Sequence, residues 1–301
     1  MLSIRSFHCL QVNFYDSLEA ATAENDLDGL VISTPTFTHE SVIRHAGVHQ
    51  TSVFTEKPVD ETADKIEALF EYAHGAGIDL CCGFQRRFDP SYVAATAAVQ
   101  EGQVGTPIMA SLFFADHPSP PKDFLLNGGN IFMDLAAHDV DYITHTLQDE
   151  VVSVYASGTS SDKDLTAADV QDNATMMMNF QQGAVVTLFM SRSATYGYDQ
   201  RCEIFGPRGL VSVGNIHANT AVISNANGIR HSRWQYSFPE RFAAAFALEM
   251  DAWADVLEKG WTWPVTAAQC VRVQRIVDAA RLSAAQGSVV TVEAYNESRL
   301  D

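Results

Sequence analysis

The chain has 301 residues, of which 47% are hydrophobic and 19% charged, a composition typical of a globular protein that buries a large core. Its formal net charge of −18 disfavours anionic partners, so we expect it to bind neither nucleic acid nor an anionic membrane surface. No apolar run approaches the roughly 18 residues that span a bilayer, and the N-terminus lacks the hydrophobic region of a secretory signal. We therefore expect a cytoplasmic protein.

The first part of the chain alternates short apolar runs with helical segments. We predict strands at residues 29–33, 51–55 and 78–84, and helices at 16–24 and 38–49. A third helix begins at Asp60 or Thr62 and ends at Gly75 to Gly77. Strands that alternate with helices of this length predict a parallel sheet with right-handed crossovers.

One expected feature of a dinucleotide-binding sheet is missing from the sequence. Such a sheet opens with a strand, a GxGxxG turn and a helix, and no GxGxxG occurs in this chain. Gly75 and Gly77 end a predicted helix, so they cannot present N-terminal helix amides to a pyrophosphate. The sequence therefore predicts a nucleotide-binding sheet without its usual first strand, glycine turn and first helix.

The pattern changes after a helix that starts near Asp89 and Pro90. We predict a stiff loop at 118–121, helices at 131–147, 239–259 and 266–286, and a final strand at 289–292. The remaining strands are predicted at 107–117, 151–156, 174–180, 184–191, 201–206, 210–213 and 220–224. Short strands separated by Gly, Asn and Asp turns predict an antiparallel sheet, and we place a domain boundary near residue 105.

The cysteines and histidines give no sign of a metal site or of disulfides. The five cysteines form no CxxC pair, so we expect free thiols in a reducing compartment. His39, His45 and His49 lie on one predicted helix, but HExxH is absent and no third ligand type accompanies them. We expect no metal.

Lys57 is the first candidate for chemistry. It follows the strand at 51–55, in the stretch Thr55-Glu56-Lys57-Pro58-Val59, at the point where ligands of an open α/β sheet lie. The alternative is that Glu56 and Lys57 are solvated loop charges that precede a helix.

Asp134 and His138 form the second candidate pair. On an α-helix residues i and i+4 lie on one face, so the carboxylate can orient the imidazole and favour its charged form. Such a pair can serve as the base that removes an alcohol proton. An ordinary surface pair, or a histidine buried at a helix interface, remains the alternative.

Two further stretches follow strands on the same side of the sheet. Arg86 and Arg87 follow the strand at 78–84 and could hold a phosphate, although one of them could form an ion pair between domains. The hydroxyl-rich stretch 33–39 can cap a helix or contact a nucleotide.

Taken together, these motifs resemble the glucose-fructose oxidoreductase and inositol dehydrogenase family (Gfo/Idh/MocA) over residues 14–292. The resemblance rests on the order and separation of STPTFTH (33–39), EKPV (56–59), GFQRRFDPSY (83–92) and DLAAHDVDYI (134–143). The later SRSATYGYDQR (191–201), EIFG (203–206) and SFPERF (237–242) are most similar to the myo-inositol 2-dehydrogenase branch.

The resemblance implies an α/β fold with two domains. Residues 1–105 would form an incomplete Rossmann-like parallel sheet. Residues 106–301 would form a C-terminal α/β domain with a large open antiparallel sheet, which binds substrate and joins subunits into dimers or tetramers.

The resemblance also implies the roles of individual residues. Lys57 would hold the reacting hydroxyl, His138 would be the general base, and Asp134 would orient it and contact the substrate. The positions implied near the cofactor are Ser33, Thr34, Pro35, His39, Glu56 and Arg87. The cofactor would be NAD, with NADP not excluded because the residue that distinguishes them has no counterpart here.

We therefore predict an NAD-dependent oxidoreductase that oxidises a ring hydroxyl of a cyclic polyol or sugar. No side chain accepts a hydride, so alcohol oxidation by a Lys/Asp/His cluster requires a nicotinamide. Three alternatives address the missing glycine turn. The chain could be a truncated product of a full-length enzyme, a non-catalytic polyol-binding or regulatory protein, or an enzyme that binds NAD weakly.

Overall fold

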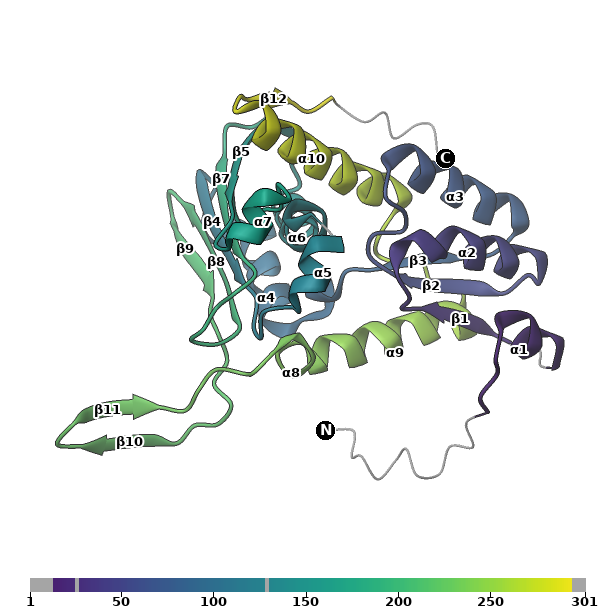
Figure 1. Ribbon diagram of the computed structural model, residues 1–301, viewed down its shortest axis with the longest axis horizontal. Helices are drawn as coiled ribbons and strands as arrows, with labels where there is room; N and C mark the ends of the chain where they lie inside the picture. Colours follow the sequence, from purple (N-terminus) through teal and green to yellow (C-terminus); the bar gives the residue numbers. More distant parts are fainter. Residues whose placement is uncertain (1–12, 25–26, 128–129, 294–301) are drawn as a thin grey trace.

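The computed structural model describes residues 13–24, 27–127 and 130–293. Two sheets form its framework, a small parallel sheet and a seven-stranded sheet, and they lie at opposite ends of the molecule in Figure 1. Residues 128 and 129 lie outside the described residues. The α/β fold class is confirmed.

The small sheet has the order β1 (Gly29–Ile32), β2 (Ser52–Glu56) and β3 (Leu80–Gly83), and both pairings are parallel. Helices α2 (His39–Val48) and α3 (Ala63–Ala76) connect the strands and lie on one face, with α1 (Leu18–Glu24) preceding β1. The short apolar runs and crossover helices predicted from sequence are therefore present.

Local capping explains where these helices begin and end. The Thr62 side chain accepts a hydrogen bond from the Lys65 amide at the start of α3, and Gly77 ends that helix with a φ of 72°. Asp89 caps α4 (Pro90–Gln100) in the same way. The sequence predicted these helices to begin at Asp60 or Thr62 and near Asp89, and both boundaries are confirmed.

The large sheet has the order β12-β5-β6-β7-β4-β8-β9. Its strands are β4 (Met109–Ala115), β5 (Val151–Thr159), β6 (Asn173–Phe180), β7 (Val185–Ser191), β8 (Asp199–Gly206), β9 (Gly209–Val213) and β12 (Val290–Thr291). The large sheet is mainly antiparallel, as predicted, but it is mixed, because β4 lies between β7 and β8 and runs parallel to β7. Its neighbours are set by long-range packing, which a local pattern does not specify.

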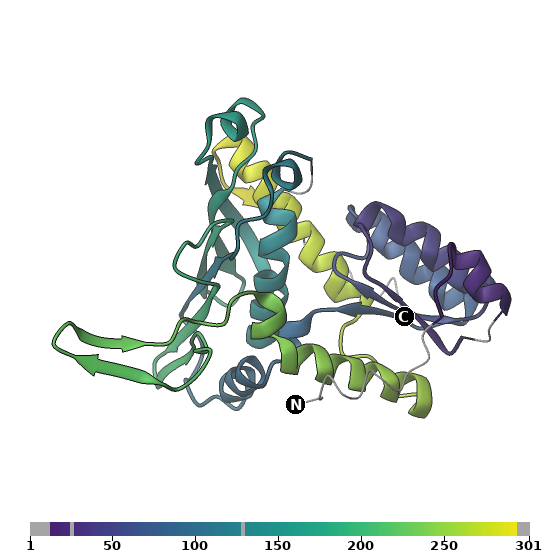
Figure 2. The same cartoon turned by 60° about the horizontal axis from the view of Figure 1, so that its bottom comes forward.

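Helices cover only one face of the large sheet in the views of Figures 1 and 2. They are α4, α6 (Ala137–Leu147), α10 (Ala267–Gln286), and the short α5 (Lys122–Asn127) and α7 (Lys163–Ala167), which sequence analysis missed. The opposite face presents large side chains that are 37–56% exposed, namely Met109, Tyr155, Met177, Phe189, Phe205 and Leu210. We call these six residues the open face.

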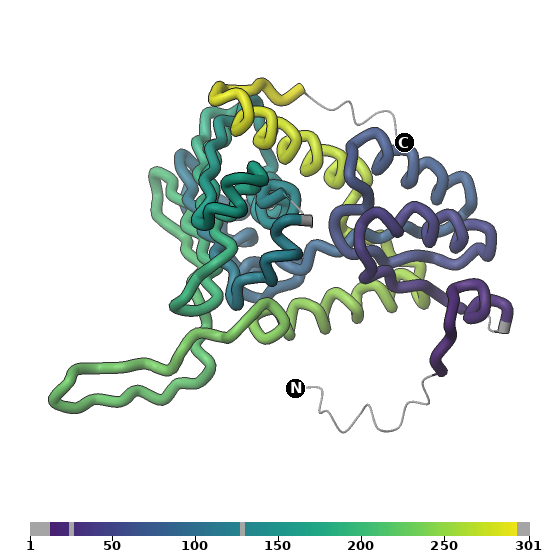
Figure 3. Tube along the Cα trace, viewed as in Figure 1, coloured from purple at the N-terminus to yellow at the C-terminus, as the bar shows by residue number. Residues whose placement is uncertain are grey.

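The strand predicted at 220–224 does not belong to the large sheet. It forms β10 (Val222–Asn225), which pairs with the unpredicted β11 (Gly228–His231) in a separate hairpin. Figure 3 shows this hairpin projecting away from the rest of the molecule. Both strands are exposed on both faces, so no buried face ties them to the large sheet.

Helices from the end of the chain return to the small sheet. Helix α9 (Ala243–Lys259), which follows the short α8 (Phe238–Arg241), covers the face opposite α2 and α3. A Cβ atom on Gly29 would lie 2.6 Å from the ring of Trp253, so the close approach of α9 to β1 requires glycine. Trp263 donates a hydrogen bond of 3.0 Å to the main-chain oxygen of Cys82. The buried apolar residues consequently form one continuous core across both sheets.

Candidate active site

The carboxyl ends of the three parallel strands meet at one rim of the small sheet. The register aligns Ile32 with Thr55, and Thr55 with Cys82. Lys57 follows β2 at this rim, and residues 33–35 follow β1 and are exposed there. Open α/β sheets bind ligands at this rim. Lys57 and residues 33–35 therefore follow strands at the rim, as the sequence pattern predicted.

The imidazole of His39 joins the two loops at the rim. Its Nε2 lies 2.9 Å from the main-chain oxygen of Thr34, and its Nδ1 lies 3.1 Å from that of Pro58. The residue is 1% exposed, and Nδ1 also lies 3.2 Å from the Thr55 hydroxyl. His39 was expected near the cofactor; its contacts place it beneath the rim, where it joins the two loops.

Lys57 connects the rim to the second part of the chain. Its Nζ donates hydrogen bonds to the main-chain oxygen of Asp134 at 2.7 Å and to Oδ1 of Asp134 at 2.9 Å. Arg192, at the end of β7, donates from Nη1 to the other carboxylate oxygen, Oδ2, at 2.5 Å. The Lys57 side chain is 10% exposed and that of Arg192 is 2% exposed. Two largely buried cations therefore hold the Asp134 carboxylate in place.

These two cations determine the ionisation of Asp134. Burial alone would raise the pKa of this carboxyl, but the charges of Lys57 and Arg192 outweigh it and hold the pKa well below its usual range. Asp134 is therefore a carboxylate throughout the physiological pH range. Both of its oxygens already accept hydrogen bonds from protein cations.

Asp134 does not orient His138 as the i, i+4 spacing predicted. Residues Phe132–Ala136 form a π-helical turn, in which hydrogen bonds join residues i and i+5. The wider turn changes the angle between Asp134 and His138, and among the described residues no hydrogen bond joins the two side chains. His138 Nδ1 is buried and has no hydrogen-bond partner within the same residues.

The expected charge of His138 is also corrected. Burial lowers its pKa well below the usual value, and the positive charges of Lys57 and Arg86 add to this effect against the opposing charge of Asp134. The imidazole is consequently neutral at neutral pH. A neutral imidazole can accept a proton, which an imidazolium cannot.

Arg86 is buried in the interior. It is 2% exposed and donates short hydrogen bonds to Asp139 on α6 and to Gln200 on β8. Its guanidinium group also lies 5.3 Å from the ring centre of Phe114. These contacts join the 3-10 turn Gln85–Phe88 to the large sheet.

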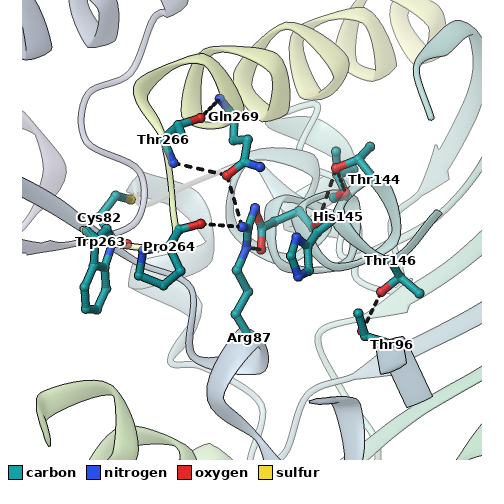
Figure 4. Close-up of polar contacts among 12 residues, drawn as sticks. Cys82, Arg87, Thr96, Thr144, His145, Thr146, Trp263, Pro264, Thr266 and Gln269 are labelled. Carbon is teal, nitrogen blue, oxygen red and sulfur yellow. Dashed lines mark hydrogen bonds and ion pairs between the residues drawn. The ribbon is translucent and has the colours of Figure 1, made fainter. Parts of the chain in front are cut away.

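Arg87, which was expected near the cofactor, forms a buried clamp. Its side chain is 3% exposed and donates two hydrogen bonds to the carboxylate of Asp141, at 2.9 and 2.6 Å. It also donates to Pro264 O and Gln269 Oε1, each at 3.0 Å. Figure 4 shows Arg87 held between these last two groups. The bidentate geometry and burial indicate a link between β3, α6 and α10.

Glu56 lies at the end of β2 near a second buried carboxyl group. Burial raises the pKa of Glu56, against the charges of Lys57 and His39. Glu249 on α9 is 1% exposed, and its Oε1 has no hydrogen-bond partner among the described residues. Burial raises the pKa of Glu249 to about 9, and the charge of Glu56 adds to the shift. Glu249 is therefore protonated at neutral pH.

Arg192 and Asp116 were missed as site residues by sequence analysis. Each directly follows a strand of the large sheet, β7 and β4 respectively. A charged residue immediately after an apolar strand is the signal that singled out Lys57, and it was available for both. The sequence pattern did not predict that β4 pairs with β7 in parallel. It therefore gave no reason to place Arg192 and Asp116 close to Asp134.

Neither a metal site nor a membrane span stands out in the parts of the chain that the structure describes. Residues 13–24, 27–127 and 130–293 contain no group of three or more His, Cys, Asp or Glu side chains placed to hold a metal ion. Over the same residues, no helix combines the length and apolar character needed to cross a bilayer.

Two family models match the chain. Residues 5–84 match the oxidoreductase family with an NAD-binding Rossmann fold, and residues 92–212 match the GFO/IDH/MocA C-terminal domain.

Relatives with assigned names are similar over most of their length. Inositol 2-dehydrogenase of Rhizobium meliloti is 33% identical over 251 residues, which are 83% of this chain and 75% of the relative. Myo-inositol 2-dehydrogenase of Thermotoga maritima is 30% identical over 236 residues, or 78% and 71% of the two chains.

A solved structure agrees with these similarities. The crystal structure of a myo-inositol dehydrogenase from Corynebacterium glutamicum superimposes with a TM-score of 0.85 at 28% identity, covering 93% of this chain and 84% of the other. The family models, the identities and the fold agree over both sheets, and the chain therefore belongs to the Gfo/Idh/MocA family of NAD-binding oxidoreductases.

Proposed function

We propose that this chain oxidises a ring hydroxyl of a cyclic polyol or sugar, as an inositol 2-dehydrogenase does, with NAD as the acceptor. The observation that carries the proposal is the Lys57–Asp134–Arg192 ion cluster beside a neutral His138, at the carboxyl rim of a Rossmann-like sheet. Relatives named as inositol dehydrogenases support the substrate class.

The residues at the rim fit one half of a dinucleotide site. Ser33, Thr34 and Pro35 are exposed at the end of β1, and Glu56 lies at the end of β2. We assign these four residues to the cofactor. When bound, NAD supplies a hydride acceptor, which no side chain can replace.

Lys57 and His138 divide the remaining chemistry. The Lys57 ammonium donates a hydrogen bond to the reacting oxygen and stabilises the negative charge that develops there. His138, neutral because of its burial, accepts the hydroxyl proton on its imidazole ring. General-base catalysis of this kind typically contributes about 10² to 10⁴ in rate.

Asp134 and Arg192 position these two groups. The carboxylate fixes the Lys57 ammonium through Oδ1, and Arg192 fixes the carboxylate through Oδ2. We assign Arg192 as a positioning residue because it acts on Lys57 through Asp134. An uncharged polyol also suits a protein with a net charge of −18, because the mean field neither attracts nor repels it.

The open face suggests that the chain forms dimers or tetramers. Phe189 of this face stacks on Phe113 with ring centres 4.3 Å apart, and Arg201 lies 4.4 Å above the Phe113 ring. Large apolar patches rimmed by polar residues usually mark protein interfaces. We propose that a second copy of this chain covers the open face.

Calorimetric titration with NAD, with and without myo-inositol, tests the proposal together with spectrophotometry of NADH formation. We expect NAD to bind and NADH to form in the presence of a cyclic polyol. Absence of NAD binding up to roughly millimolar concentration, the weak end of ordinary affinities, would refute the enzyme proposal for this chain. Because the sequence has no GxGxxG turn, we expect NAD affinity below that of relatives which carry one.

A further inference from the structure

Asp116 and Arg192 follow two neighbouring strands of the large sheet, β4 and β7, at the same end of that sheet. The end of β4 is aligned with the end of β7, where Ala115 pairs with Ser191. The main-chain amide of Asp116 donates a hydrogen bond of 2.8 Å to the main-chain oxygen of Ser191. The Ala194 amide donates a hydrogen bond of 2.8 Å to the main-chain oxygen of Asp116. These two bonds fix Asp116 beside the segment that carries Arg192.

The Asp116 carboxyl group lies close enough to the charged cluster of the site to interact with it electrostatically. The groups that act on it electrostatically are Arg192 at the end of β7, Asp134 on the π-helical turn, and Lys57 after β2. Burial raises the pKa of Asp116 to about 6, with Arg192 opposing the shift and Asp134 adding to it. The group is therefore mostly ionised at pH 7 and above, and it can accept hydrogen bonds there.

Hydrogen-bond capacity distinguishes Asp116 from Asp134. Both oxygens of Asp134 accept from Lys57 and Arg192. The Asp116 carboxylate interacts with the neighbouring main-chain amide of His117, and no side chain of the described residues donates a hydrogen bond to it. It is half-buried rather than enclosed, so a small molecule can reach it. A half-buried carboxylate with spare acceptor capacity is suited to a hydroxyl donor.

We propose that Asp116 accepts a hydrogen bond from a second, non-reacting hydroxyl of the substrate and so determines which polyols the site selects. The inference rests on the proposed function and deepens it. Lys57 and His138 engage the hydroxyl that is oxidised, and a neighbouring hydroxyl of a cyclic polyol would then lie against Asp116. A site built to hydrogen-bond a substrate hydroxyl discriminates strongly against an analogue that lacks it, because its polar group is left unpaired.

The test compares the wild type with Asp116→Asn and Asp116→Glu, using NAD, myo-inositol and the monodeoxy derivatives that each lack one hydroxyl. Asp116→Asn removes the charged acceptor, so we expect KM to rise roughly 10- to 100-fold while kcat changes little. Asp116→Glu keeps the charge at a different position and should change the order of preference among the polyols. Asp251→Asn, an exposed residue on α9, is the matched control for the loss of one negative charge.

The deoxy series identifies the hydroxyl concerned. One derivative should bind the wild type poorly, and Asp116→Asn should cause no further loss for that derivative alone. Calorimetry should show weaker polyol binding with unchanged NAD affinity. An Asp116→Asn protein that folds and has the wild-type KM, or that weakens all derivatives equally, would overturn the inference. A wild type that neither binds nor oxidises any cyclic polyol would instead overturn the proposed function.

Discussion

The ammonium group of Lys57 lies 2.9 Å from Oδ1 of Asp134, although 77 residues separate them in the sequence. The contact joins the end of β2 to the π-helical turn of the second part of the chain. Lys57 is therefore not a solvated loop charge, because its side chain is only 10% exposed.

Replacement of Lys57 by alanine should abolish most of the turnover. We expect kcat to fall by about 10² to 10⁴, because the developing charge on the reacting oxygen loses its cation. NADH formation measures the effect, and circular dichroism checks the fold. Lys163→Ala removes an exposed lysine of α7 and serves as the control. Wild-type turnover by a folded Lys57→Ala protein would refute the assigned role.

Replacement of Arg192 by glutamine should misplace Asp134 and, through it, Lys57. We expect kcat to fall by about 10²-fold, the scale of a 1 Å misplacement. The pKa values of Asp134 and Asp116 should both rise because Arg192 lowers each of them, so the acid limb of the pH–rate profile should move to higher pH. Arg192→Lys should restore part of the rate.

The control for Arg192 is Arg230→Gln, which removes an exposed arginine from the projecting hairpin. If Arg192→Gln lowers stability and rate but leaves the acid limb where it was, Arg192 has a merely structural role.

Glu249 should make the stability of the protein depend on pH. Its pKa is raised from 4.5 in the unfolded chain to about 9 in the folded protein. The folded state therefore binds the extra proton, and its contribution to the free energy of unfolding is full below pH 4.5 and lost as pH rises toward 9. The free energy of unfolding of Glu249→Gln should match that of the wild type near pH 5 and exceed it near pH 8. The difference should grow by up to about 1.4 kcal/mol for each pH unit between these two values.

Chemical denaturation across this pH range measures the difference. Asp255→Asn, a partly exposed carboxylate on the same helix, should not show it. Parallel pH profiles for the wild type and Glu249→Gln would contradict the assignment of a buried protonated carboxyl.

Replacement of Phe189 by glutamate should dissociate the proposed oligomer. Phe189 lies in the open face, and a charge there would have to be buried without a partner on association. Light scattering should give a dimer or tetramer for the wild type and a smaller species for Phe189→Glu. Val48→Glu places the same charge at an exposed apolar position of α2 and should leave the mass unchanged. A monomeric wild type would refute the proposal.

Much of the site could be predicted from sequence, because its residues follow strands or occupy short spacings. Lys57 at the end of β2 and residues 33–35 at the end of β1 lie where the strand pattern placed them. The pairing of Asp134 with His138 was not correctly predicted, because the π-helical turn changes the spacing on which it relied. The contacts of Arg87 could not be predicted, because its partners on α6 and before α10 lie far away in the sequence.

The amino-acid sequence by itself determined the local elements of this protein: the apolar runs that become β1 to β3, the caps at Thr62 and Asp89, and the cation at the end of β2. Periodicity and capping act within a few residues, so they can be seen in one stretch of chain. Only the tertiary structure decided that β4 lies beside β7, and that Asp134 is therefore held between Lys57 and Arg192. Those contacts depend on strand order and on burial, which give His138 its neutral state and leave Asp116 as the spare acceptor.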